Sequence, residues 1–221
     1  MFPTSTVGRK ILIAITGQMM VLFVIFHILG NSSIYFSNLN AYAAALHAMP
    51  LLLWLVRLVM AAALVIHVYL GIVVTLENWK AKSGSYAVSN QISATFAGQT
   101  MIWSGTLIGA FLIYHLLHFT LQVIYPQLSA LRNPDLLGRP DVSMMVVLSF
   151  RHIGIAAFYI ISVSALLLHL LHGIQSSFQT CGLNNDNSLP IITRGGQIAA
   201  TLLFLGYAAI PVVIVVGILK G

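Results

Sequence analysis

Residues 51–76 read LLLWLVRLVMAAALVIHVYLGIVVTL, a stretch in which Arg57 is the only side chain with a permanent charge. The hydrocarbon core of a bilayer is about 30 Å thick, and an α-helix needs roughly 20 apolar residues to cross it. This stretch exceeds that length and carries an ionisable residue, His67, near its middle. It predicts a transmembrane helix, and a histidine at that depth points to a functional role.

Four other stretches share this length and composition. The five expected spans are residues 11–36, 51–76, 100–124, 142–178 and 197–219. Overall, 59% of the residues are hydrophobic and 6% are charged, whereas about a quarter of the residues of a soluble domain are charged. Residues 1–221 are therefore expected to form a single all-α membrane domain of five transmembrane helices, the first four of them in a bundle.

The formal net charge of +6 comes from ten Lys and Arg against four acids. These cations are scattered singly, which argues against a nucleic-acid-binding face and favours contact with lipid headgroups. The expected spans put Arg9, Lys10, Lys80, Lys82 and Arg194 on one side of the membrane, and Arg132, Arg139, Arg151 and Lys220 on the other. The side that holds the N-terminus has a small excess of Lys and Arg, and these residues lie in short segments. This excess predicts that the N-terminus is in the cytoplasm.

Several functions need residues that the chain lacks. Cys181 is the single cysteine, so an internal disulfide and an iron–sulfur cluster with four protein ligands are both excluded. No acidic residue falls in the middle of an expected span, which argues against an ion-coupled transporter or a proton path built on buried carboxylates. The chain also has no P-loop, catalytic triad or CxxC motif.

Eight histidines are unusual in so apolar a chain. Six of them fall inside the first four expected spans: His27, His67, His115, His118, His169 and His172. A single histidine within lipid would more readily be explained as a hydrogen-bonded structural residue. Six of them on four different helices predict instead a shared site within the bundle.

The depth of each histidine sorts four of them into two levels. At 1.5 Å per residue, His27 lies about 27 Å and His115 about 22 Å from the cytoplasmic end, while His67 and His169 lie about 15 Å from it. Each level joins alternate spans, as diagonal partners in a four-helix bundle do. Because two imidazoles on opposite faces of a haem make an electron-transferring centre, we predict two b-type haems. An outer couple, His27 with His115, would hold one, and an inner couple, His67 with His169, the other.

Two of these ligands have rivals three residues away. His118 competes with His115, and His172 competes with His169. We favour His115 and His169. The rivals are expected to hydrogen-bond a haem propionate or a neighbouring helix.

Glycines follow the two inner candidates at the same spacing, as His67-x3-Gly71 and His169-x3-Gly173. Residues four apart lie on one face of a helix, so each glycine leaves room beside its histidine for a flat macrocycle. Gly30 follows His27 by three residues. The alternative is that these glycines only allow close packing of helices in the membrane.

Polar residues near the outer level are candidates for other contacts. Haem propionates need cations, and Arg57 and Arg151 both fall at that depth, although each could equally be an arginine that reaches for the headgroups. A quinone head needs polar neighbours near a haem edge. Tyr42 and His47, together with Arg57, are the candidates for that role.

Three stretches resemble the cytochrome b membrane-anchor subunit of succinate dehydrogenases and fumarate reductases, of the five-helix, two-haem type. They are GRKILIAITGQMMVLFVIFHILGN (8–31), LNAYAAALHAMPLLLWLVRL (39–58) and HGIQSSFQTCGLNNDN (172–187). The resemblance covers nearly the whole chain. It implies one haem ligand on each of the first four helices, and the matching positions are His27, His67, His115 and His169.

The resemblance also implies partners. A flavoprotein subunit and an iron–sulfur subunit would dock on the cytoplasmic side of a prokaryotic inner membrane and interconvert succinate and fumarate. This chain would exchange electrons with quinone, often menaquinone, and would hold no succinate or fumarate site itself. One departure is Leu167, which stands where some fumarate-reducing relatives have a glutamate implicated in proton passage.

Two other functions fit parts of the pattern. The chain could be the di-haem anchor of another quinone-linked oxidoreductase, of the nitrate reductase or hydrogenase type. It could also be a transporter without a cofactor, whose histidines line a polar path. The partner subunits separate the first alternative from the main prediction, and the presence of haem separates the second.

Overall fold

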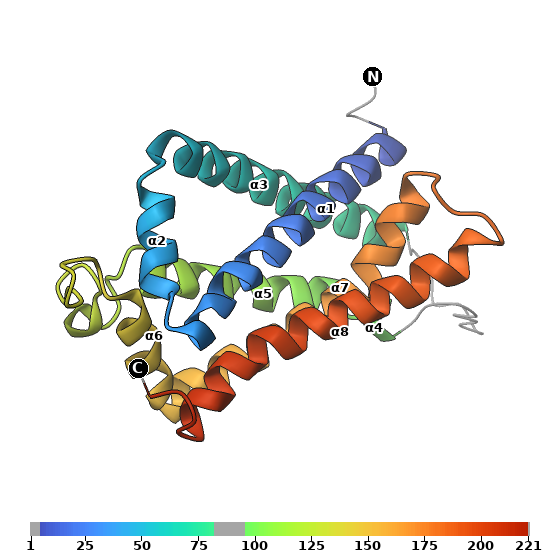
Figure 1. Ribbon diagram of the computed structural model, residues 1–221. Helices are drawn as coiled ribbons and strands as arrows, with labels where there is room; N and C mark the ends of the chain where they lie inside the picture. The colour runs from blue at the N-terminus through green and yellow to red at the C-terminus, as the bar shows by residue number, and fades with distance from the viewer. Residues whose placement is uncertain (1–4, 82–95, 221) are drawn as a thin grey trace.

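The computed structural model describes residues 5–81 and 96–220 (Figure 1). Lys82, counted above among the cations near the N-terminal side, lies outside these ranges. The helices are α1 (Thr6–Asn31), α2 (Leu39–His47), α3 (Pro50–Ala81), α4 (Phe96–Gln99), α5 (Met101–His115), α6 (Val142–Arg151), α7 (Ile153–Thr180) and α8 (Ser188–Val215).

Five helical segments are long and apolar enough to cross a membrane. They are α1 with a following 3-10 turn, α3, α5 with a following π-helical turn, α7 and α8. Within the described ranges there is no β-strand, only an isolated bridge between Pro134 and Pro140. The expected all-α membrane protein with five transmembrane helices is confirmed.

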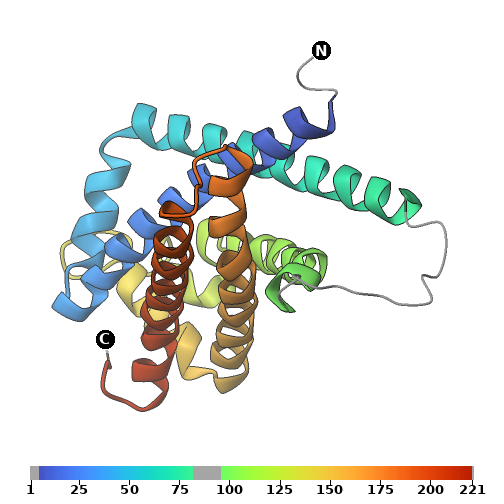
Figure 2. The ribbon, with the colours of Figure 1, turned by 90° about the vertical axis from the view of Figure 1, so that its right-hand side faces the viewer.

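The first four of these segments form a four-helix bundle. Going around it, α1 packs against α3 on one side and α7 on the other, α5 packs against α7, and α3 meets α5 over a shorter stretch. The helices on the two diagonals are therefore α1 with α5 and α3 with α7. α8 runs alongside α7 on the outside of the bundle and also contacts α1 (Figure 2).

Polar contacts tie α1 to two of its neighbours in the bundle. Arg9 forms an ion pair with Glu77, which joins α1 to α3. The Gln18 side chain donates a hydrogen bond to the Ser177 hydroxyl, which joins α1 to α7. No buried side-chain nitrogen or oxygen among the described residues lacks a hydrogen-bond partner, as a low-dielectric interior requires.

The structure corrects the expected span 142–178, which is two helices. The backbone of His152 is extended, with ψ at 104°, and separates α6 from α7. The His152 carbonyl accepts hydrogen bonds from the amides of Ile155 and Ala156, at 2.9 and 3.1 Å, and so starts α7 afresh. α6 is too short to cross a bilayer.

Other boundaries also differ from those expected. The stretch between the first two spans contains α2, which makes a short helix before Pro50 begins α3. The third span leaves α-helical geometry after His115 and continues only through a π-helical turn, Leu116–Thr120, rather than to residue 124. The fifth helix begins at Ser188, earlier than residue 197, and ends at Val215.

Asn40 joins α2 to the loop before α6. Its amide nitrogen donates to the carboxylates of Asp135 and Asp141, at 3.3 and 2.9 Å, and its amide oxygen accepts from the Ser143 amide at 2.8 Å. Arg139 pairs with Asp135 in the same loop, at 2.7 Å. The hydrogen bond from the Arg139 side chain lowers the pKa of Asp135. A depressed folded-state pKa means that this contribution to stability is present at neutral pH and is lost on acidification.

Replacing Asn40 by alanine is expected to lower the free energy of unfolding by about 1–3 kcal/mol, because three partners lose a hydrogen bond. Thermal unfolding of the purified protein in detergent measures this loss. Asn38→Ala is the control, because Asn38 is exposed and its side chain makes no capping hydrogen bond. An equal loss in both variants would show that the Asn40 contacts add nothing specific.

Candidate functional site

Two couples of histidine rings meet across the diagonals of the bundle. His27 on α1 faces His115 at the end of α5, with ring centroids 5.9 Å apart and ring planes at 90°. His67 on α3 faces His169 on α7, with centroids 6.3 Å apart and planes at 61°. The structure thus brings together both of the predicted couples, and each couple spans one diagonal.

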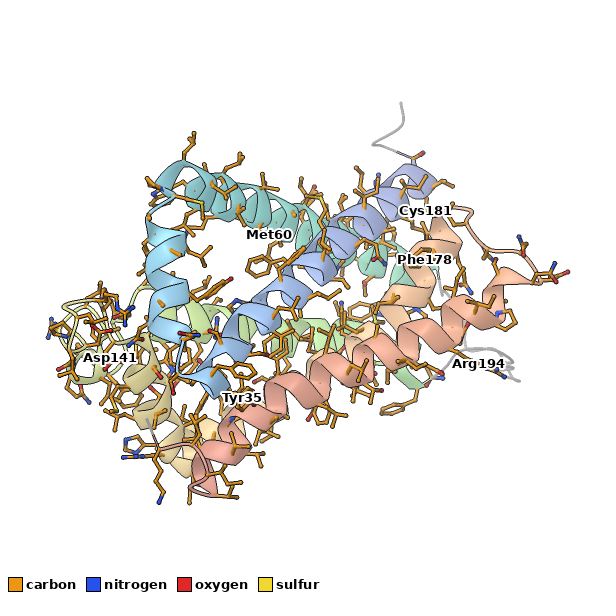
Figure 3. All side chains as sticks on the ribbon, in the orientation of Figure 1. Tyr35, Met60, Asp141, Phe178, Cys181 and Arg194 are labelled. Atoms are coloured by element: carbon orange, nitrogen blue, oxygen red, sulfur yellow. The ribbon has the colours of Figure 1, made fainter. Side chains whose placement is uncertain are left out.

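The two ends of the bundle are marked in Figure 3 by Asp141, which caps α6, and by Cys181, which ends α7. The outer couple lies nearer the Asp141 end and the inner couple nearer the Cys181 end. The register along α7 supports this order, because Tyr159 contacts His115 whereas His169, ten residues later in the same helix, contacts His67.

The ring of His67 is held by the first turns of α1. Its Nδ1 lies 3.0 Å from the carbonyl oxygen of Ile13 and 3.3 Å from the hydroxyl of Thr16. That hydroxyl donates its single proton to the Leu12 carbonyl, at 2.7 Å. Because a carbonyl can only accept, Nδ1 must carry the proton, and the lone pair of the neutral ring is on Nε2.

The ring of His169 is held in the same way by α5. Its Nδ1 lies 3.2 Å from the hydroxyl of Ser104. Ser104 donates its own proton to the Met101 carbonyl, at 3.1 Å, so its oxygen is free to accept from the imidazole. In their neutral form, both inner rings are therefore Nδ1–H tautomers with the lone pair on Nε2.

Glycines allow these close approaches. A Cβ atom on Gly17 would lie 3.2 Å from Cε1 of His67, and one on Gly105 would lie 3.4 Å from Cε1 of His169. The first distance is tighter than ordinary van der Waals contact and the second is at its lower limit, so a side chain larger than alanine would push against either ring. A Cβ atom on Gly71 or Gly173 would meet no atom within 4 Å, which leaves open space one turn beyond each inner imidazole.

α1 and α5 share a pattern that the sequence analysis missed. Residues 16–27 and 104–115 both begin with a hydroxyl residue and glycine and end in an outer histidine, at the same spacing. In each helix the glycine touches an inner ring, and the outer ring lies ten residues later. At 1.5 Å per residue, both helices place the two couples about 15 Å apart along the bundle.

Aromatic side chains surround the outer couple. Phe23 stacks on the His27 ring with centroids 5.5 Å apart, and Tyr207 of α8 lies 6.2 Å from it. His115 contacts Phe111 and Phe119 at 5.6 and 5.7 Å. These rings line the outer couple, in which both imidazoles are partly exposed.

The rival histidines have other positions. His118 is 2% exposed, and both of its ring nitrogens are engaged, Nδ1 with the Tyr159 hydroxyl and Nε2 with the Ser149 hydroxyl. His118 therefore has no nitrogen left for a metal. His169 rather than His172 meets the ring of His67.

The polar candidates of the outer level are engaged elsewhere. Arg57 lies over the ring of Trp54, at 5.2 Å, and Arg151 donates to the carbonyl of Lys220 at 2.7 Å. His47 bonds to a carbonyl of its own helix, at 2.8 Å. Tyr42 packs so closely on Gly30 that a Cβ there would lie 2.5 Å from the Tyr42 ring. No hydrogen bond or ring contact recorded for the described residues joins any of these four side chains to a paired imidazole. Their propionate and quinone roles stay predictions.

Each couple offers two imidazoles, which is the number of protein ligands that a six-coordinate haem iron would take. No three His, Cys, Asp or Glu residues in the described part of the chain are grouped to hold an ion. A porphyrin supplies four ligands itself and needs only two from the protein. With metal–nitrogen bonds of about 2.0–2.1 Å and ring centres about 1.1 Å further on, two opposed imidazoles have centroids about 6.3 Å apart. The inner couple has this separation, at 6.3 Å, and the outer couple is slightly closer, at 5.9 Å.

Comparisons with known proteins return nothing for this chain. A scan against protein-family models finds no match, and searches of curated proteins and of solved structures find no significant match.

Proposed function

We propose that this protein is a di-haem cytochrome b membrane anchor. It transfers electrons between a membrane quinone and the iron–sulfur subunit of a succinate dehydrogenase or fumarate reductase. The quinone is menaquinone, the species that the resemblance often implies. The observation that carries this proposal is the pair of diagonal imidazole couples, whose ring centroids lie 5.9 and 6.3 Å apart, close to the separation of two imidazoles on one iron.

The chain's own residues prepare both couples for ligation. His67 and His169 present a bare Nε2 because their Nδ1 protons are held by α1 and α5. Aromatic rings contact both His27 and His115 and help to hold the outer couple in place. When bound, a haem iron between two imidazoles takes up and returns one electron while it keeps both ligands.

The spacing of the two couples supports electron transfer through the bilayer. About 15 Å along the helix axis separates them, and this would be the spacing of the two haem sites along the bundle. In this proposal the inner couple faces the cytoplasm, with the N-terminus on that side, where the flavoprotein and iron–sulfur subunits dock. The open space at Gly71 and Gly173 would leave room for the edge of a macrocycle held by the inner couple.

The experiment that tests this function uses the complex purified from native membranes. We expect a flavoprotein and an iron–sulfur subunit to co-purify. Succinate should reduce the haem, so that the absorption band of a reduced b-haem appears, and a quinone analogue should reoxidise the haem, so that the band disappears. A haem that responds to quinol but co-purifies with a nitrate- or hydrogen-converting partner would assign the anchor to another complex. A chain that carries no haem would favour a transporter instead.

A further inference from the structure

A line of four hydrogen-bonding side chains ends at the outer ligand His115. The Ser149 hydroxyl on α6 lies 3.1 Å from Nε2 of His118, and Nδ1 of His118 lies 3.2 Å from the Tyr159 hydroxyl on α7. The same hydroxyl lies 3.4 Å from Nδ1 of His115. Ser149 and Tyr159 are 0% and 7% exposed, so water does not compete for these contacts.

The direction of every proton in this line follows from its far end. Ser149 donates to the Met145 carbonyl at 2.7 Å, so its oxygen can only accept from His118. Nε2 of His118 therefore carries the proton, and the bare Nδ1 accepts from Tyr159. With its one proton used, the Tyr159 oxygen accepts from Nδ1 of His115. The lone pair of His115 is then on Nε2, the nitrogen available to an iron.

We propose that Ser149, His118 and Tyr159 are positioning residues that fix His115 as the Nδ1–H tautomer and strengthen it as a haem ligand. This inference rests on the proposed function, because it requires His115 to ligate a haem iron. The three positioning residues would touch no iron themselves. Hydrogen bonds to the second nitrogen of a ligating histidine orient the ring and raise its basicity.

The backbone supports the arrangement. His118 lies in the π-helical turn Leu116–Thr120, where the amide of Leu121 bonds to the Leu116 carbonyl at 2.7 Å. π-helical turns are rare and are frequent at functional sites. His67 and His169 donate to a carbonyl or hydroxyl of the adjacent helix. His115 instead donates to Tyr159 of α7, and the line of hydrogen bonds continues to Ser149 of α6.

The first test removes the tyrosine hydroxyl. In Tyr159→Phe, Nδ1–H of His115 loses its acceptor, the imidazole becomes a weaker electron donor, and the ferric state is less stabilised. We expect the midpoint potential of the outer haem to shift upward in a potentiometric titration, while that of the inner haem stays in place. The outer haem is identified as the one that is lost in His115→Ala.

A second variant, Ser149→Ala, tests the relay from its far end. Without Ser149, the Nε2 proton of His118 has no acceptor. Nothing then fixes which group donates in the hydrogen bonds from His118 through Tyr159 to His115. We expect a smaller upward shift of the outer midpoint in the native background and no additional shift in Tyr159→Phe. A merely structural role would give the same shift in both backgrounds. Ser162→Ala is the control, because Ser162 is 1% exposed and donates only to Phe158 of its own helix.

The outcomes separate this inference from the function on which it rests. Two haems whose midpoints do not move in either variant, or an additive effect of Ser149→Ala, would overturn the relay and leave the di-haem anchor standing. Absence of haem from the native protein would overturn both. If Tyr159→Phe is not recovered in folded form, Ser149→Ala against Ser162→Ala still decides, since an unshifted outer midpoint in Ser149→Ala overturns the relay.

Discussion

Replacement of His67 by alanine is expected to reduce the haem content from two to one per chain. The remaining partner, His169, would face a site with a single imidazole, too few axial ligands for a low-spin centre. The outer couple lies about 15 Å away along the helices and keeps both of its rings. Quantifying haem against protein after purification, with a reduced-minus-oxidised spectrum, measures the change. His169→Ala is expected to give the same result.

His172→Ala is the matched control for this prediction. It lies one turn from His169 on the same helix, but its ring does not meet His67. The control is expected to keep both haems. Two haems per chain in His67→Ala or His169→Ala would show that the inner couple has been assigned wrongly.

Replacing Gly17 or Gly105 by leucine is expected to remove the inner haem and to spare the outer one. The Cβ atom alone would lie 3.2 Å from His67 or 3.4 Å from His169, and the leucine branch extends further into the ring. A well-packed interior does not accommodate such a side chain without moving its neighbour. Because iron ligation needs the ring within a few tenths of an ångström, displacement by a methyl group abolishes it.

Gly195→Leu serves as the control for this pair. Gly195 lies on α8, and a Cβ atom there would meet nothing within 4 Å. Haem content and the amplitude of each redox transition distinguish the variants. If Gly17→Leu and Gly105→Leu retained the inner haem with unchanged midpoint potential, glycine at these two positions would not be needed for His67 and His169 to hold that haem.

Hydropathy was sufficient to predict the five transmembrane helices, because length and lack of charge determine which segments dissolve in lipid. It was insufficient for the boundaries. The break at His152 depends on the hydrogen bonds that its carbonyl makes to α7, which composition does not reveal. α2 was missed because a short helix outside the membrane has no hydropathy signal of its own.

Depth along each helix predicted which histidines face one another, since the rise of an α-helix is constant. Whether they bind haem stays a prediction. The side chains that hold the rings could not be found by that reasoning. Thr16 and Ser104 bond to their own helices and look unremarkable in sequence, and only the register between neighbouring helices brings them to His67 and His169.

A usable signal for these residues was nevertheless present. The hydroxyl–glycine pair at the start of residues 16–27 recurs at the start of residues 104–115, and both stretches end in histidine. The two helical hairpins α1–α3 and α5–α7 therefore contribute equivalent halves to the inner couple. The offset along the chain between the two hydroxyl–glycine stretches differs from the offset between His67 and His169. The pattern therefore does not appear as a repeat of fixed period.

The most direct measurement is the haem content of the purified native protein, read with its dithionite-reduced spectrum. Two imidazole couples at two depths predict two b-type haems per chain, both low-spin, with an absorption band at the position of a reduced b-haem. A colourless protein, or one that holds a single iron porphyrin per chain, would contradict the account.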